Sequence, residues 1–434
     1  MRANEVLDST TCETLDRAVR ARQALADEMF DQLRGATHDG VGILRPSYGA
    51  GEDRAHQLLA EHARALGLAV SHDAAGNTFV TLTGRDRHAP AIVVGSHLDS
   101  VAQGGNYDGA AGVVGGLMAL AALRDVGVTP ASDIRVMGIR AEEGEWFGAS
   151  YIGSRAALGT LPAPLLDEAR RADSGRTLRE HMLDSGCDPA SIAAGHQSLS
   201  PSGLRAFIEL HIEQGPVLED DGVPIGLVTG VRGNSRLHAA RCVGEFSHCG
   251  GVPRHRRRDA VAAVAELVIA LDEDWTRFEE TGGDFAFTVG KLSTDASEHA
   301  MSKIPGVVDF TLDMRSVDGN LLSDMEQRVR ALAAGIGERR RVRFELGDFL
   351  RVEPGAMCPQ LRAALGTSAR TLGVPGMTLA SGASHDAAAF AAVGVPSAML
   401  FVRNANGSHN PRESMAHEDL TQAVRVLARW LMTG

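Results

Sequence analysis

Histidine and carboxylate side chains follow short apolar runs at several places in this 434-residue chain. Imidazole and carboxylate ligands in loops suit zinc, manganese, cobalt or nickel. Three histidines and several carboxylates of this kind would suit two ions that are bridged by one carboxylate. The candidate residues, in chain order, are His97, Asp99, Asp108, Glu142, Glu143, His211 and His409.

Each of these motifs also has an ordinary structural interpretation. A His-x-Asp sequence is typical of surface loops, a Glu-Glu pair is usually solvated, and a Ser-His-Asn-Pro sequence is typical of a turn. Their arrangement favours a metal site instead, because they stand in order at the ends of predicted strands, with glycines between them. The sequence therefore predicts a metal-dependent centre built from loops.

The segment before residue 230 alternates predicted strands and helices. An alternation of this kind predicts an α/β layer sandwich, and open α/β sheets bind ligands just beyond the ends of their strands. We predict helices over 13–34, 52–66 and 109–126, and strands over 91–95, 133–139 and 204–210.

A second pattern begins after residue 230. We predict strands over 235–246, 285–292, 307–315 and 341–346, and helices over 259–271 and 321–336. The order βαββαβ is that of a ferredoxin-like domain. Because α/β character resumes after residue 357, we predict a catalytic domain in two parts, 1–231 and 348–434, with an inserted domain over 232–347.

The composition excludes several classes of protein. A net charge of −12 disfavours a nucleic-acid binder, and the basic run 254–258 is better explained as a solvated segment or a contact with an anionic substrate. No apolar run is long enough to span a membrane, and no secretory signal is evident, so we expect a cytoplasmic protein. Five scattered cysteines indicate neither disulfides nor a cysteine zinc site.

Several motifs in order resemble the hydantoinase/carbamoylase branch of the M20 metallopeptidase-like amidohydrolases, from about residue 15 to the C-terminus. That branch includes N-carbamoyl-L-amino acid hydrolases, allantoate amidohydrolases and β-ureidopropionases. The resemblance implies a metal-dependent exopeptidase-like catalytic domain, with a mixed sheet between helices, and an inserted dimerisation and lid domain. The matching segments read GSHLDSVAQGGNYDG, AEEG followed by GSRA, ELHIEQGPVLE, IGLVTGVRG, IPGVVDFTLDMRS, SGASHDAA and SHNPRE.

The resemblance also assigns the ligands of two divalent ions per subunit, zinc or else manganese, cobalt or nickel. It implies that His97, Asp108 and His211 hold one ion. Asp108, as the bridge, would hold the other ion together with Glu143 and His409.

The same resemblance makes Glu142 the general base and places Asp99 behind the imidazole of His97. Two cations lower the pKa of a bridging water and polarise the substrate carbonyl. Glu142 would accept the proton of that water and deliver it to the leaving nitrogen. A carboxylate behind a metal-binding histidine fixes its tautomer.

Substrate contacts are implied at Gln214, His385 and Ser384, of which Ser384 replaces a glycine of the family. Arg315 matches a carboxylate clamp, since a guanidinium fork binds a carboxylate bidentately. The residue that usually accompanies this clamp is an asparagine thirteen residues upstream, and here it is Ser302.

His248 matches a family histidine that reaches the partner subunit's active site and helps to stabilise the tetrahedral oxyanion. The surrounding loop departs from the usual text, with Gly251 and Val252 before the proline and Arg254 after it. A capped turn before the next helix is the structural alternative for this segment.

The sequence thus predicts a homodimer, joined through 232–347, that cleaves the N-carbamoyl group of a small carboxylate. The leading reaction converts an N-carbamoyl-L-amino acid and water to the L-amino acid, CO2 and NH3. Allantoate amidohydrolase, β-ureidopropionase, N-acyl amino acid deacylase and dipeptidase are alternatives on the same scaffold. A non-catalytic metal- or ligand-binding protein is the alternative of another class. No nucleic-acid or membrane partner is expected.

Overall fold

The computed structural model describes residues 9–433, and its internal contacts divide the chain into two compact units. Unit 1 comprises the chain up to Thr229 and again from Ala356 onward. Unit 2 is the segment between them, Gly230–Gly355. No helix among the described residues is long and apolar enough to cross a membrane.

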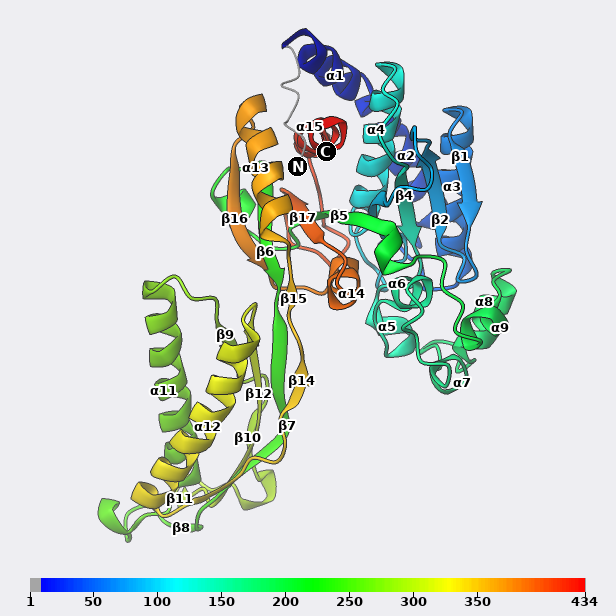
Figure 1. Ribbon diagram of the computed structural model, residues 1–434. Coiled ribbons are helices and arrows are strands. Elements are labelled where there is room, and N and C mark those ends of the chain that lie inside the picture. The colour runs from blue at the N-terminus through cyan, green and yellow to red at the C-terminus, as the bar shows by residue number, and fades with distance from the viewer. Residues whose placement is uncertain (1–8, 434) are drawn as a thin grey trace. The chain divides into compact units, whose positions relative to one another are not determined.

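Unit 1 is built on a mixed sheet that has helices packed against it (Figure 1). Among the described residues the sheet has nine strands, in the order β1-β2-β4-β3-β5-β17-β6-β15, with β16 on β6. The strands are Ala69–His72 (β1), Thr78–Leu82 (β2), Ala91–His97 (β3), Ile134–Ile139 (β4), Leu204–Ile212 (β5), Ile225–Val231 (β6), Gly355–Ala356 (β15), Gly376–Ser381 (β16) and Ser397–Val402 (β17).

The central strands β4, β3, β5 and β17 are mutually parallel, whereas β2 and β6 flank them antiparallel. The helices of unit 1 are Ser9–Ala21 (α1), Gln23–Thr37 (α2), Ala50–Ala65 (α3), Ala110–Asp125 (α4), Gly144–Phe147 (α5), Ile152–Ala157 (α6), Leu165–Glu168 (α7), Leu178–Asp184 (α8), Pro189–Ala193 (α9), Val217–Asp220 (α10), Pro359–Leu372 (α13), Asp386–Ala392 (α14) and His417–Thr433 (α15).

Helix α4 is the central helix of the core. It is buried from Ala110 to Leu123 and packs against β3, β5 and α15. Small residues allow this close approach: a Cβ on Gly112 would lie 2.1 Å from the backbone oxygen of Leu210. The small-residue composition of the segment thus brings the start of α4 against the ends of β3 and β5.

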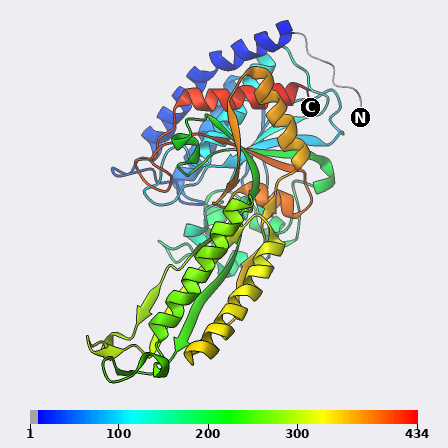
Figure 2. The same cartoon turned by 90° about the vertical axis from the view of Figure 1, so that its left-hand side faces the viewer.

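Unit 2 has an antiparallel sheet with two long helices beside it (Figure 2). Alternate residues of β12 are buried, and the buried face packs against both helices. The helices are Ala260–Glu280 (α11) and Gly319–Arg340 (α12). The strands are Gly233–Val243 (β7), Ser247–His248 (β8), Ala286–Thr288 (β9), Leu292–Thr294 (β10), Lys303–Ile304 (β11), Val307–Ser316 (β12), Arg343–Glu345 (β13) and Leu350–Val352 (β14).

The predicted mixed α/β fold is confirmed, and two predicted elements are wrong in detail. The single helix expected over 13–34 is two helices, because the chain leaves helical geometry around Arg22. The single strand expected over 285–292 is two short strands, which separate at Val289–Lys291. The apolar pattern alone did not indicate either interruption.

Candidate metal centre and active site

The five predicted metal ligands converge on Asp108 in unit 1. Their ligand atoms form two groups, each with all atoms within 4.8 Å of one another. The first group is His97, Asp108 and His211. The second group is Asp108, Glu143 and His409.

The two carboxylate oxygens of Asp108 face different groups. Oδ1 lies 3.5 Å from Nε2 of His97 and 3.2 Å from Nε2 of His211. Oδ2 lies 3.2 Å from Nε2 of His409, which is itself 3.5 Å from Oε1 of Glu143. This is the arrangement expected of a carboxylate that bridges two cations.

The chemistry of the donors fits divalent metal. Nε2 of His97 and Nε2 of His211 face each other across 3.4 Å, and Oδ1 of Asp108 is buried without a hydrogen-bond partner. A buried oxygen that lacks a donor, beside two imidazole nitrogens, has the character of a ligand set. Nitrogen and oxygen ligands of this kind suit zinc, manganese, cobalt or nickel.

Parallel strands bring these side chains to one edge of the sheet. His97 ends β3, and His211 lies near the end of the adjacent β5. Asp108 follows β3 on the loop that leads into α4. The next residue, Gly109, has φ +64°, and a Cβ there would lie 2.6 Å from the ring of His97. Glycine is therefore required at this position by both its conformation and its space.

Backbone strain is concentrated at the same edge. Three non-glycine residues there have a left-handed backbone: Ala141 (φ 53°), Gln214 (φ 64°) and His409 (φ 57°). Such conformations are costly for residues with a Cβ and persist where the surrounding structure enforces them. His409 is a predicted ligand, Gln214 is a predicted substrate contact, and Ala141 immediately precedes the Glu142-Glu143 pair.

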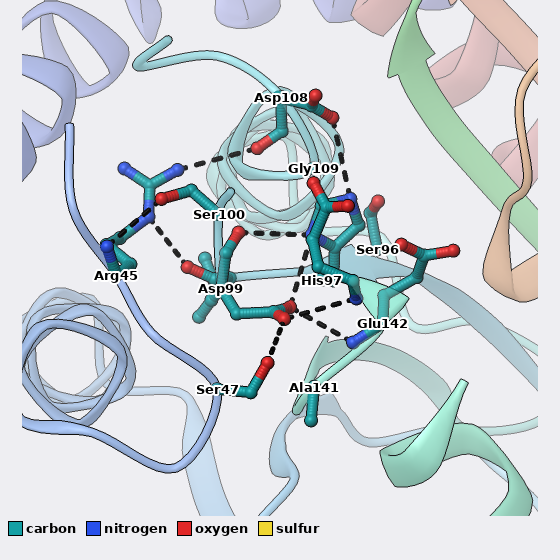
Figure 3. A network of polar contacts seen from close by, with 12 residues as sticks. Arg45, Ser47, Ser96, His97, Asp99, Ser100, Asp108, Gly109, Ala141 and Glu142 are labelled. Atoms are coloured by element: carbon teal, nitrogen blue, oxygen red, sulfur yellow. Dashed lines mark hydrogen bonds and ion pairs between the residues drawn. The ribbon is translucent and has the colours of Figure 1, made fainter. Parts of the chain in front are cut away.

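Asp99 lies behind His97, as Figure 3 shows. One carboxylate oxygen is 3.3 Å from Nδ1 of the imidazole. The carboxylate also accepts the backbone N–H groups of Glu142 and Glu143, at 3.1 and 3.2 Å. Ser47 donates its hydroxyl to the same carboxylate at 2.6 Å. Asp99 thus connects the first histidine to the backbone of the acidic pair.

The charges of the site interact strongly. Burial by itself raises the pKa of Asp108, but contacts with His211, His409 and His97 outweigh it and hold that pKa well below its usual range. The pKa of His409 is raised to about 9, chiefly by its contact with Asp108. The pKa of His97 is also raised, so in the metal-free protein His97 and His409 supply positive charge beside the buried carboxylate.

Glu142 is buried beside the ligands but belongs to neither Asp108 group. Its carboxylate lies within 4.8 Å of the ligand atoms of His97 and Glu143. Burial raises the pKa of Glu142 well above its usual range. The hydroxyl of Ser384 donates to Oε1 of Glu142 at 3.1 Å. Ser384, predicted as a substrate contact, thus contacts the candidate base.

Gln214 and His385 also lie at the site. The amide of Gln214 donates to Oδ2 of Asp108 at 2.9 Å. The imidazole of His385 is fully buried, 4.4 Å from that of His211 between ring centroids, and its Nδ1 has no hydrogen-bond partner. The other ring nitrogen, Nε2, lies 2.8 Å from the hydroxyl of Ser381. Both side chains therefore lie against the ligand cluster.

His248 and Ser302 are adjacent within unit 2. β8 pairs with β11 through His248 and Lys303, and the carbonyl of Ser302 accepts the N–H of Cys249 at 2.9 Å. Nδ1 of His248 accepts the N–H groups of Gly250 and Gly251, at 3.1 and 3.0 Å. The proton of the neutral imidazole therefore lies on Nε2, which is left as a donor.

Arg315 and Ser302, which the family resemblance pairs, lie far apart within one chain. Ser302 precedes β12, and Arg315 lies near the far end of that strand, opposite Asn234. At about 3.3 Å per residue, the strand from Val307 to Arg315 alone spans about 26 Å. Within one chain the two side chains cannot hold the same carboxylate. Arg315 instead donates to Asp313, at 3.0 and 3.3 Å.

Arg45 and Glu413 are among the buried ionic groups at the site that the sequence analysis missed. Arg45 is fully buried, and its guanidinium donates to the carbonyl of Leu98 at 2.7 Å and approaches that of Asp108 (Figure 3). Glu413 is buried and accepts the backbone N–H of Asp108 at 3.2 Å. Glu413 ends the SHNPRE motif, which was the one available signal. Nothing distinguishes Arg45 in the sequence.

Asp386, next to His385, provides a stability prediction. Burial raises its pKa to about 7, and Oδ2 is buried without a partner. The folded protein therefore binds a proton that the unfolded chain loses near pH 4, so stability falls as pH rises from about 4 to 7. In metal-free protein, Asp386→Asn should remove this loss. The measurement is denaturant unfolding at pH 5 and pH 8, where the stability of the variant relative to wild type should rise with pH. A constant difference would contradict the prediction.

Comparisons with known proteins identify the family of this chain. Residues 93–433 match the model of "Peptidase family M20/M25/M40". The chain belongs to this family. It is 36% identical to an N-carbamoyl-L-amino acid amidohydrolase of Geobacillus stearothermophilus, over 89% of this chain and 92% of that protein. It is 32% identical to an allantoate amidohydrolase of Bacillus subtilis (strain 168), over 91% and 93% of the two chains.

A solved structure is similar over nearly the whole chain. The amidase of the hydantoinase/carbamoylase family from Burkholderia multivorans superposes with a TM-score of 0.82 at 29% identity, and the match covers 95% of this chain and 97% of that one. The resemblance to the hydantoinase/carbamoylase branch of M20 is thereby confirmed. The protein is a hydrolase that acts on amide C–N bonds.

Proposed function

We propose that this M20 hydrolase is a binuclear-metal N-carbamoyl-L-amino acid amidohydrolase, which forms the amino acid, CO2 and NH3. The observation that carries the proposal is the pair of ligand groups that share Asp108, with the buried Glu142 beside them. Relatives named for cleaving N-carbamoyl amino acids, at up to 36% identity, support the substrate class.

In this proposal the ions, when bound, lower the pKa of the attacking water and polarise the substrate carbonyl. Glu142 accepts the proton of that water and passes it to the leaving nitrogen. Its burial favours the first half of this cycle, because a raised pKa makes the carboxylate a stronger base towards the water. The Ser384 hydroxyl holds Oε1, so rotation of the Glu142 carboxylate is restricted.

We further propose that Arg315 binds the substrate carboxylate. The Arg315 side chain is 39% exposed, and a planar guanidinium can bind a carboxylate bidentately.

Arg315→Ala should raise KM by about 10-fold to 100-fold, the scale of a lost charge-assisted hydrogen bond of about 1.5–3 kcal/mol. Steady-state kinetics with an N-carbamoyl amino acid measure this change. Arg236→Ala is the matched control, because Arg236 also pairs with Asp313 on the same sheet. An unchanged KM in Arg315→Ala would remove the carboxylate anchor from the proposal.

We also propose that unit 2 contains the ferredoxin-like lid and dimerisation domain predicted over 232–347. His248 would act in the partner subunit's site as a donor to the oxyanion, through Nε2. Because Ser302 lies beside His248 and far from Arg315, Ser302 would act there too, so that one bound carboxylate meets Arg315 and Ser302 from different chains.

This arrangement predicts complementation between inactive variants. Glu142→Gln and His248→Ala should each lose most activity, and mixing them under conditions of subunit exchange should restore part of it. One of the two sites in the mixed dimer then has both residues. Activity that stays at background, although exchange is demonstrated with differently tagged chains, would contradict action across the dimer.

The direct test of substrate class is a panel of N-carbamoyl, N-formyl, N-acetyl and peptidyl amino acids, with allantoate and N-carbamoyl-β-alanine, assayed with added manganese, cobalt, nickel or zinc. The proposal expects the highest kcat/KM, with release of ammonia, for an N-carbamoyl-L-amino acid. Preference for acetyl or peptidyl substrates would replace it with the deacylase or dipeptidase alternative. The reaction needs only water and a small carboxylate, in keeping with the expected cytoplasmic location.

A further inference from the structure

Glu413 is a buried carboxylate to which the proposed mechanism gives no role. Its Oε1 accepts the backbone N–H groups of Tyr107 and Asp108, at 2.8 and 3.2 Å. Its Oε2 lies 2.6 Å from the hydroxyl of Ser408, and that hydroxyl is also 2.6 Å from Oδ2 of Asp108. Glu413 therefore contacts both the backbone and, through Ser408, the side chain of the shared ligand.

Glu413 also lies on the loop that carries His409. The turn between them is closed by a hydrogen bond from the N–H of Glu413 to the carbonyl of Asn410, at 3.2 Å. Asp108 lies 305 residues earlier, on the loop before α4. One carboxylate thus connects two distant loops, each of which supplies a ligand to the group of Asp108, Glu143 and His409.

Space for this carboxylate is provided by Gly105. A Cβ on Gly105 would lie 2.1 Å from the carboxyl carbon of Glu413. Gly105 is not among the residues with positive φ, so its backbone conformation does not require glycine. A Cβ on the neighbouring Gly104 would approach no atom closer than 3.2 Å. The absent side chain at 105 therefore accommodates Glu413 specifically.

We propose that Glu413 is a positioning residue that fixes the separation of Asp108 and His409 and so determines the affinity for the metal ion between them. The inference rests on the proposed binuclear function. Partners that orient metal ligands typically contribute about 10-fold to 100-fold in metal affinity. The ion held by His97, Asp108 and His211 should depend less on Glu413, because neither histidine lies on the loops that it joins.

The experiment is a titration of metal-free protein with Mn²⁺, which measures the affinity of each of the two ions. Glu413→Ala and Gly105→Ala should lower the affinity for one ion by about 10-fold to 100-fold and the affinity for the other by much less. Gly105→Ala displaces the carboxylate while Glu413 itself is unchanged. Gly104→Ala is the matched control and should bind as wild type does.

Glu413→Gln separates positioning from charge. The amide oxygen can accept both backbone N–H groups, and the amide N–H can donate to Ser408, whose own hydroxyl hydrogen remains for Asp108. This variant should therefore bind both ions with nearly wild-type affinity. Ser408→Ala leaves the hydrogen bonds from the backbone to Glu413 in place, so it should lower the affinity for the same ion by a smaller factor. This variant tests the inference if Glu413→Ala does not fold.

Two results would overturn the inference while leaving the proposed function intact. One is wild-type affinity for both ions in Glu413→Ala and Gly105→Ala. The other is a loss of metal affinity in Gly104→Ala as large as that in Gly105→Ala, which would indicate general disturbance of the loop. If the wild-type chain itself bound fewer than two ions, the proposed function would fail first, and the inference with it.

Discussion

Replacement of Glu142 by glutamine should reduce kcat by about 10²–10⁴-fold and leave the metal content unchanged. An amide of the same shape cannot accept a proton from water. It can still accept the Ser384 hydroxyl through its oxygen, so the side chain keeps its position. Since Glu142 belongs to neither of the two ligand groups that share Asp108, both ions should remain bound.

The matched control is Glu145→Gln, in the helix that follows. Glu145 is exposed and accepts the N–H of Ala102 at 2.9 Å. The same chemical change there should leave kcat within a few-fold of wild type. Near-wild-type turnover in Glu142→Gln, with both ions retained, would show that another group accepts the proton.

Replacement of Asp108 by alanine should remove both ions, which is the largest effect expected of a single ligand. The change leaves His97 with His211 on one side and Glu143 with His409 on the other, each one ligand short of the three that a catalytic zinc site uses. Activity should fall to background.

Glu143→Ala provides the comparison, because Glu143 belongs to only one of the Asp108 groups. It should lose one ion and retain the other, which elemental analysis after dialysis can resolve. Retention of both ions by Asp108→Ala, in a protein whose unfolding remains cooperative, would contradict the bridging role.

The proximity of the candidate ligands could be predicted because its signals are local. His97, Asp108 and His211 each follow an apolar strand or precede a helix, and parallel strands bring such positions to one edge. The glycine after Asp108 was evident as a feature of the loop. The structure gives the reason for this glycine, because a Cβ at Gly109 would lie 2.6 Å from the ring of His97.

The surroundings of the ligands could not be predicted, because they depend on contacts between distant segments. Arg45 and Glu413 join the site across long stretches of chain, and a single buried charge leaves no periodic pattern in a sequence. The separation of Ser302 from Arg315 is similar: the family resemblance paired the two positions, but the extended strand between them places them apart within one chain.

The central claim, a site for two ions that share Asp108, is tested most directly by the metal content of the fully loaded wild-type protein. Elemental analysis, with protein concentration from amino acid analysis, should give two divalent ions per chain. Glu143→Ala should give one ion and Asp108→Ala none. A wild-type chain that is fully active with a single ion would contradict the account.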